Sequence, residues 1–282
     1  MSIQLANLDN MGRKNRFSKQ RESEMKKMIG IVGGVGSYAS IDLIKKIYDN
    51  TDAKTDQDHL PVSMLSAPHK VLDRTMYLMG EIKENPGIAI AEIITTLSLN
   101  GAEIIGIPCN TAHAPVIFNE ILNRIPEKCQ VVHLVEEVAR YISTNFPAMK
   151  RVGVLGTNGT IKTLIYSEVL VKYGIEVLYP SEEMQKMYVH PAIYDLEYGI
   201  KAFSNPVNSR AQQDLMIVAT NLSRKGADAI ILGCTEIPLA INVGTIEKSI
   251  VIDATTILAK ALIRESMKMD ALTGNDEASS NI

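Results

Sequence analysis

The segment Asn100-Gly-Ala-Glu-Ile-Ile-Gly-Ile-Pro-Cys109 returns 125 residues later as Lys225-Gly-Ala-Asp-Ala-Ile-Ile-Leu-Gly-Cys234. Each copy contains a short apolar run of the kind that forms a buried parallel strand, and each ends on a cysteine. Similarity at a fixed offset indicates duplicated structural units. We therefore place Cys109 and Cys234 at equivalent positions in two related halves of the chain.

Two further pairs of segments repeat in the same order at nearly the same offset. Residues 29–37 match residues 152–160, and residues 131–134 match residues 251–254. Between them, β-branched runs alternate with helical patterns, which is typical of βαβ units. We predict an α/β fold of two similar Rossmann-like domains related by pseudo-two-fold symmetry. Ligands of such sheets bind at the carboxyl ends of the strands, so we expect the active site in the cleft between the domains.

Composition excludes several classes of protein. The chain has 282 residues, of which 46% are hydrophobic and 22% charged, which suits one large or two ordinary domains and excludes a disordered or fibrous chain. A net charge of −3 and the absence of Trp argue against nucleic-acid binding. No apolar run approaches the roughly 18 residues that a membrane span needs, and the first 27 residues lack the apolar core of a secretory signal. We expect a cytoplasmic protein without a membrane partner.

The two ends of the chain differ from the rest in composition. Residues 1–27 carry seven Lys or Arg against three acidic residues, and this polar segment is predicted to be a disordered basic leader. Residues 271–282 are small, polar and acidic, and we expect a frayed tail there.

The three cysteines form no CxxC pair, which argues against a disulfide framework and a structural zinc site. Cys129 has no counterpart in the other half, so we interpret it as a small buried apolar residue. Cys109 and Cys234 could also be small buried apolar residues. Each, however, is followed by polar residues and then a proline, a pattern that predicts a helix start. The positive end of a helix dipole would lower the pKa of both thiols and make them reactive.

Two thiols on opposite faces of a substrate carbon form a two-base device, in which one removes a proton and the other delivers a proton from the far side. Inversion of a stereocentre follows. Two related halves suit this chemistry, because similar groups must act on both faces of one substrate.

Four motifs together resemble the aspartate racemase branch of the aspartate/glutamate racemase superfamily. They are Gly30-Ile-Val-Gly-Gly-Val-Gly-Ser37, Pro108-Cys-Asn-Thr-Ala-His113, Gly156-Thr-Asn-Gly-Thr-Ile161 and Gly233-Cys-Thr-Glu-Ile-Pro238. The resemblance covers about residues 28–265. It implies a homodimeric racemase of acidic amino acids that uses no cofactor and no metal. It also implies a first domain of residues 28–142 plus 240–270 and a second domain of residues 143–239.

The resemblance also implies roles for individual residues. Cys109 and Cys234 would transfer the protons. Asn110, Thr111 and Thr235 would donate hydrogen bonds to the substrate's α-carboxylate, and Thr160 would also bind substrate. The family's distal carboxylate binders are an Arg in an Asp-Arg-Thr segment, matched here by Arg74, and a Lys matched best by Lys201. Cations at both positions would select aspartate or glutamate over neutral amino acids.

Substrate preference stays open between aspartate, glutamate and a broader range. Glutamate racemases usually carry Asp-Ser after the first strand and His after the second Cys-Thr, where this chain has Gly33-Gly34 and Glu236. It therefore resembles the aspartate branch more closely.

A weaker alternative is an NAD-dependent oxidoreductase. Gly34-Val-Gly-Ser-Tyr-Ala39 fits a G-x-G-x-x-A fingerprint, but the next predicted strand, residues 62–65, lacks the acidic residue that would hold the ribose. His113 lies four residues after Cys109, where it could activate the thiol or be half of a metal site, or simply be a core or helix-surface histidine.

Overall fold

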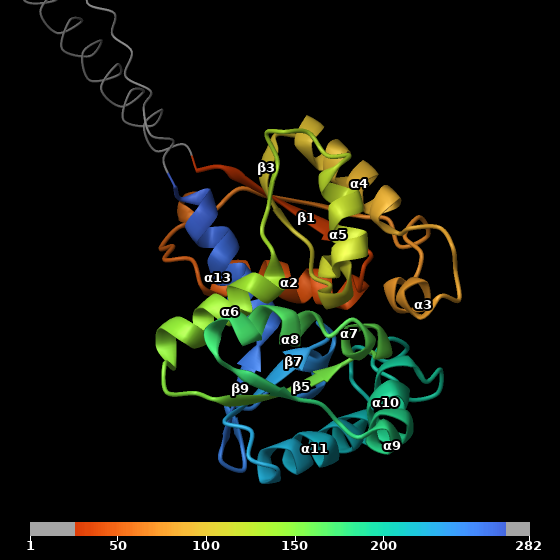
Figure 1. Cartoon of the computed structure of the whole chain (residues 1–282). Helices are drawn as coiled ribbons and strands as arrows, with labels where there is room; N and C mark the ends of the chain where they lie inside the picture. Colours follow the sequence, from red (N-terminus) through yellow and green to blue (C-terminus); the bar gives the residue numbers. More distant parts are fainter. Residues whose placement is uncertain (1–25, 269–282) are drawn as a thin grey trace, which may run out of the picture.

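The computed structural model describes residues 26–268 of the chain. The tail 271–282 and all but the last two residues of the leader lie outside the described residues. Two α/β layers lie one above the other (Figure 1). The first contains β1 (Met28–Gly33), α2 (Ser37–Asp49), β2 (Val62–Ser66), α3 (Arg74–Met79), α4 (Gly87–Leu99), β3 (Ala102–Gly106), α5 (Pro115–Leu122) and β4 (Gln130–Val131), followed by α6 (Leu134–Asn145).

The second layer begins at β5. Its elements are β5 (Arg151–Gly156), α7 (Asn158–Lys162), α8 (Ile165–Leu170), β6 (Glu176–Leu178), α9 (Glu182–Met184), α10 (His190–Tyr194), α11 (Ser209–Arg224), β7 (Ala229–Gly233), α12 (Ile237–Ala240), β8 (Thr245–Ile246) and β9 (Ser249–Asp253), followed by α13 (Ala254–Ser266). Short 3-10 turns cover Asp56–Asp58, Asn110–His113 and Val171–Tyr173, and a π-helical turn covers Gln185–Val189.

The two sheets repeat one strand order. The first sheet runs β2-β1-β3-β4 and is parallel throughout. The second runs β6-β5-β7-β9 in parallel and adds β8 as an antiparallel edge strand. In both sheets the parallel strands, numbered by their order in the chain of that half, are therefore arranged as second, first, third and fourth. The predicted two-domain α/β fold is confirmed.

The domain limits differ from the prediction at the C-terminal end. Residues 240–270 were assigned to the first domain, but β8 and β9 belong to the second sheet, because β9 is hydrogen-bonded to β7 in register from Ala229 with Ile250 onward. The chain returns to the first layer only with α13, which packs against α2. The backbone groups of β9 therefore find their hydrogen-bond partners in the second sheet.

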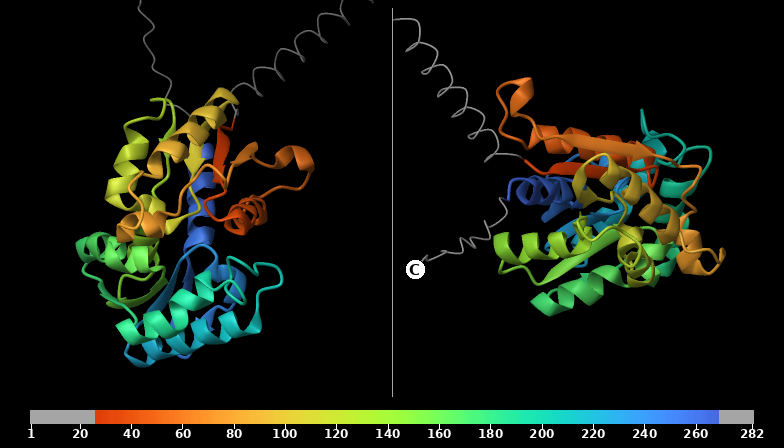
Figure 2. Two further views of the ribbon diagram at one scale, coloured as in Figure 1. Left: turned by 90° about the vertical axis from the view of Figure 1, so that its right-hand side faces the viewer. Right: turned by 90° about the horizontal axis from the view of Figure 1, so that it is seen from above.

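Helices α6 and α13 lie between the two sheets (Figures 1 and 2). Each helix begins just after the fourth parallel strand of its half, at an N-cap residue. The side chain of His133 caps α6 and that of Asp253 caps α13. Each of these helices packs against a helix of the other half. Helix α6 contacts α8, α13 contacts α2, and α6 and α13 also contact each other.

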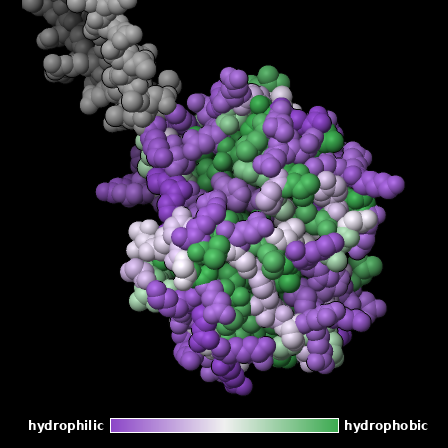
Figure 3. Space-filling model, viewed as in Figure 1, coloured by the Kyte–Doolittle hydropathy of each residue, from purple (hydrophilic) through white to green (hydrophobic). Residues whose placement is uncertain are grey.

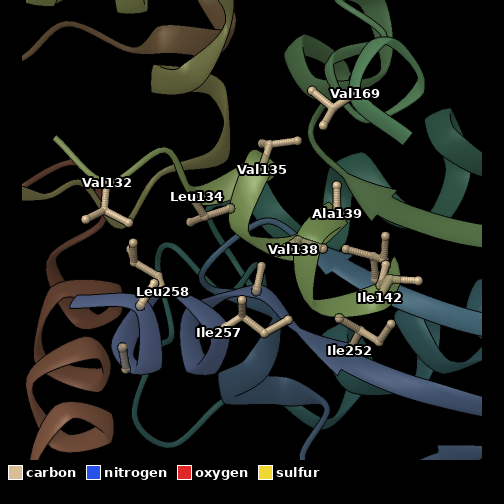
Figure 4. Close-up of a cluster of buried hydrophobic side chains, with 14 of the residues drawn as sticks. Val132, Leu134, Val135, Val138, Ala139, Ile142, Val169, Ile252, Ile257 and Leu258 are labelled. Carbon is tan, nitrogen blue, oxygen red and sulfur yellow. The ribbon is translucent and has the colours of Figure 1, made fainter. Parts of the chain in front are cut away.

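A single hydrophobic cluster joins the halves through these helices. Leu134, Val135 and Val138 of α6 lie beside Ile257 and Leu258 of α13, and the same cluster reaches both sheets through Ile31 and Val154 (Figure 4). The relative position of the two layers is therefore set by a continuous apolar core.

Within residues 26–268, no helix combines the length and the apolar character that crossing a membrane requires.

Hydrophilic residues spread over much of the face seen in Figure 3, with apolar residues between them.

Candidate active site

The two repeated cysteines lie at the carboxyl ends of the two central strands. Cys109 follows β3 after two residues, and Cys234 follows β7 directly. Both are nearly buried, with 6% and 5% of their surface exposed. Both line the same narrow cavity.

All eight residues assigned to the site from sequence line this cavity. They are Arg74, Cys109, Asn110, Thr111, Thr160, Lys201, Cys234 and Thr235. Sequence reasoning did not assign seven further lining residues, which are Val35, Asp73, Thr75, Thr157, Tyr194, Gly233 and Glu236. Most of these lie within or beside the quoted motifs, and Tyr194 lies in the segment 193–201 that carries Lys201, so motif membership was an available signal.

Cys109 caps a 3-10 turn rather than the long helix that the sequence pattern predicted. The turn covers Asn110–His113, and α5 begins only at Pro115. The interruption arises because Ala114 is extended, so the turn and α5 are separate elements. The Cys109 sulfur lies 3.3 Å from the Thr111 hydroxyl, which can donate a hydrogen bond to it.

Cys234 has a different neighbour. Its thiol donates a hydrogen bond of 3.0 Å to Oε2 of Glu236. Burial and the negative charge of Glu236 raise the pKa of the Cys234 thiol well above its usual value. The expected lowering of this pKa by a helix start was wrong for Cys234, because α12 is a single turn and the thiol is buried against the carboxylate of Glu236.

Asn110 is oriented by a tyrosine from the opposite half. The buried Tyr166 hydroxyl donates a 2.6 Å hydrogen bond to Oδ1 of Asn110. Burial raises the pKa of Tyr166, so this hydroxyl keeps its proton and remains a donor. Nδ2 of Asn110 is buried without a hydrogen-bond partner in the described part of the chain. An amide donor is thus held in the cavity wall with its N–H groups unused.

Threonine hydroxyls connect the two halves beside the cysteines. Oγ1 of Thr235 donates to the carbonyl of Pro108 at 2.8 Å. Oγ1 of Thr75, in α3, donates to Oγ1 of Thr157 at 2.9 Å. Thr160 is within 3.5 Å of the Gly233 carbonyl. These hydrogen bonds close the cavity from both layers.

Arg74 is buried at the start of α3, with its guanidinium held by two carbonyl groups. Nη2 donates to Val35 at 2.8 Å and Nη1 donates to Leu72 at 3.1 Å. Nε is buried and has no partner among residues 26–268. Burial disfavours the charge, but the neighbouring Cys109, Asp73 and Glu236 outweigh it and raise the pKa of Arg74. The side chain therefore supplies a fixed positive charge beside Cys109.

Lys201 is already paired with a carboxylate. Its Nζ lies 2.6 Å from Oε1 of Glu236 and 5.4 Å from the centre of the Tyr194 ring. Burial alone would raise the pKa of Glu236, but Lys201, the Cys234 thiol and Arg74 together lower it. Glu236 is therefore ionised at neutral pH, and it links one proposed cation to one proposed catalytic thiol.

A second cavity of about 250 Å³ adjoins the narrow one and shares Asp73, Arg74, Lys201 and Glu236 with it. The glycine-rich turn after β1 forms part of its wall. A Cβ at Gly36 would lie 2.7 Å from Oε1 of Glu236. Glycine at this position of the G-x-G pattern thus permits the close approach of Glu236.

His113 and Cys129 belong to the core. His113 is fully buried, its Nδ1 lies 2.9 Å from the carbonyl oxygen of Cys109, and its ring stacks on Phe118. Burial, with a smaller effect of His133, lowers its pKa to about 3. It is therefore neutral and supports the backbone of the cysteine turn. Cys129 is 8% exposed and packs in the apolar cluster of the first layer.

Comparison with known proteins identifies the family of the chain. The family model of Asp/Glu/Hydantoin racemases matches residues 32–262. The broad specificity amino-acid racemase RacX of Bacillus subtilis is 30% identical over 241 residues, which cover 84% of this chain and 96% of RacX.

Solved structures show the same fold. The aspartate racemase of Picrophilus torridus is 30% identical with a TM-score of 0.71, covering 85% of this chain and 94% of that one. An aspartate racemase homologue from Pyrococcus horikoshii superposes with a TM-score of 0.66 at 24% identity, covering 86% of this chain and 100% of that one. With a family match over most of its length and relatives aligned across nearly their whole chains, this chain belongs to the Asp/Glu/Hydantoin racemase family and is an amino-acid racemase.

Proposed function

We propose that the protein interconverts L- and D-aspartate by a two-thiol, two-base transfer of the α-proton, with Cys109 and Cys234 as the proton-transferring residues. The observation that carries the proposal is the meeting of these two sulfur-bearing residues, from equivalent strand ends of two related layers, in one narrow polar cavity. The name of the Picrophilus relative supports aspartate as substrate.

The proposed reaction moves one proton on each face of the α-carbon. The thiolate of one cysteine takes the α-proton, and the electron pair of the C–H bond passes to the carbon and its carboxylate. The thiol of the other cysteine then protonates the carbon from the opposite face. Donors near the α-carboxylate stabilise the charge that develops there. The unpartnered Nδ2 of Asn110 and the hydroxyl of Thr111 support this role, whereas the Thr235 hydroxyl must first give up its hydrogen bond to the Pro108 carbonyl.

The two thiols have different neighbours. The Cys234 thiol donates a hydrogen bond to Glu236 and has a raised pKa, so it begins the reaction as the acid. Cys109 has no carboxylate partner of this kind and lies beside the charged guanidinium of Arg74. Cys109 therefore acts first as the base, and the roles exchange when the opposite enantiomer is the substrate.

The side-chain carboxylate is assigned to Arg74 and Lys201 at the junction of the two cavities. A second candidate is a broader amino-acid range. It is favoured by the ion pair between Lys201 and Glu236, which leaves Lys201 only partly available to a substrate carboxylate, and by the name of the RacX relative.

The remaining parts of the proposal are independence from pyridoxal phosphate, assembly as a homodimer and a cytoplasmic location. The thiol pair supports the first, because it supplies both the base and the acid. Hydroxylamine captures pyridoxal phosphate, so activity that is undiminished after this treatment supports independence from pyridoxal phosphate. Light scattering measures the oligomeric state.

The decisive experiment is proton NMR of the purified protein in D₂O with L-aspartate, L-glutamate and L-alanine in parallel, followed by chiral analysis. Loss of the α-proton signal of aspartate together with formation of D-aspartate is the expected result. Exchange without inversion would contradict the two-base mechanism. Turnover of alanine as fast as aspartate would replace aspartate specificity with the broader range.

A further inference from the structure

Glu236 lies at the junction of the two cavities, because it lines both of them. A substrate whose α-carbon lies between Cys109 and Cys234 can extend its side chain along the shared wall into the larger cavity. That wall carries Arg74 and Lys201, but also Glu236, which is 4% exposed.

The Glu236 carboxylate is already ion-paired with the ammonium group of Lys201. Oε1 accepts from Lys201 Nζ at 2.6 Å, while Oε2 accepts from the Cys234 thiol at 3.0 Å and lies 3.4 Å from the Thr235 hydroxyl. The two side chains of the pair are only 26% and 5% exposed, so solvent screens their attraction little. A buried pair of this kind does not release its cation without a compensating partner.

The charges on the shared wall are balanced. Arg74 and Lys201 are opposed by Glu236 and by Asp73, whose carboxylate caps α3 and accepts from Tyr194. A substrate carboxylate that reaches Lys201 must approach Glu236 to within a few ångströms, so repulsion offsets part of its attraction to the cations. A neutral side chain of the same shape does not meet this repulsion.

We infer that Glu236 is a specificity-determining residue whose carboxylate stands in for the side-chain carboxylate of a substrate at Lys201, so that the site accepts neutral amino acids alongside aspartate. The inference rests on the proposed function and deepens it by naming the substrate class. The preference for aspartate over neutral amino acids is then limited by Glu236 and not by a lack of cations in the site.

The test compares L-aspartate with its neutral isostere L-asparagine. The kcat/KM of α-proton exchange in D₂O is measured for both substrates in the wild type and in Glu236→Gln. We expect the aspartate-to-asparagine ratio of kcat/KM to rise at least about tenfold in the variant, because Lys201 is freed and the repulsion is removed. Any effect of the substitution on Cys234 changes both substrates alike and cancels in the ratio.

Three comparisons complete the test. Glu247→Gln, at an exposed ion pair with Arg224, is the matched control and should leave the ratio unchanged. Lys201→Met should lower the ratio more in the Glu236→Gln background than in the wild type, since only there is the ammonium free. In the wild type, succinamate should inhibit at least as strongly as succinate, a measurement that needs no variant.

An unchanged ratio in Glu236→Gln, or inhibition by succinate more than about tenfold tighter than by succinamate, overturns the inference. Failure of the proposed function would look different, because the wild type would then exchange the α-proton of neither amino acid.

Discussion

Cys109 and Cys234 occupy equivalent sequence positions but unequal surroundings. The Cys109 sulfur lies beside a hydroxyl and near a guanidinium, whereas the Cys234 thiol donates a hydrogen bond to a carboxylate. Substituting Cys109→Ala or Cys234→Ala should each reduce racemisation by about 10²–10⁴-fold or more, because inversion needs a proton-transfer group on both faces. Chiral chromatography of aspartate measures the loss.

The matched control for these variants is Cys129→Ala, a buried cysteine outside the cavity, which should racemise at the wild-type rate. Near-wild-type turnover by either Cys109→Ala or Cys234→Ala would show that the two-base assignment is wrong.

Arg74 offers a buried Nε with no partner in the described range, while its two Nη atoms are held by carbonyls. Arg74→Leu should therefore lower kcat/KM for aspartate about ten- to hundredfold more than for alanine, since only aspartate loses a charged hydrogen bond. Arg124→Leu, in the exposed turn after α5, is the control. Equal losses for both amino acids would remove Arg74 from carboxylate binding.

At the scale of elements, the third sequence repeat corresponds to a strand followed by a capped helix. The match of residues 131–134 with 251–254 marks the points where α6 and α13 begin. The repeat predicted equivalent elements, but it did not predict that each helix packs against the other half. Caps are local and readable from sequence, whereas the partner of an apolar helix face depends on the whole assembly.

Asp253 accepts from the backbone N–H groups of Thr255 and Thr256 and also pairs with Lys46 of α2. Asp253→Ala should lower the free energy of unfolding by about 1–2 kcal/mol through loss of the cap. Asp49→Ala, which removes an exposed pair with Lys45, should change it by less than about 0.5 kcal/mol. Urea unfolding measures both, and equal effects would show that the cap contributes nothing.

Across the whole molecule, the continuous core couples both halves to one unfolding transition, and His113 makes that transition sensitive to acid. Its pKa of about 3 in the folded protein lies below the usual value near 6.5, so the unfolded chain binds a proton that the folded chain does not. Its contribution to stability is intact above pH 6.5 and is lost as the pH falls toward 3.

Between pH 7 and pH 5 this loss amounts to about 2 kcal/mol for one such histidine. His113→Gln should therefore lose about that much less stability than the wild type over this interval, as measured by urea unfolding at each pH. The exposed His69→Gln is the control and should follow the wild type. Parallel curves for His113→Gln and the wild type would place the acid sensitivity elsewhere.

The sequence by itself determined the two α/β halves and the equivalence of the cysteines. These follow from local patterns, namely apolar runs that must be buried and repeats at a fixed offset. The other six residues that line the cavity with the cysteines were expected only through the resemblance to a family. The resemblance to a family of racemases also rested on those motifs, and the family match confirms it.

Only the tertiary structure decided that Glu236 lies between Lys201 and Cys234, that Tyr166 orients Asn110, and that β9 completes the second sheet. The contacts to Lys201 and Asn110 and the pairing of β9 join residues tens of positions apart in sequence, and the proton state of Cys234 follows from its burial beside a charge. No local pattern encodes such distances. They arise when the two layers close on a shared core, which sets the pKa of each group and the charge that a substrate meets.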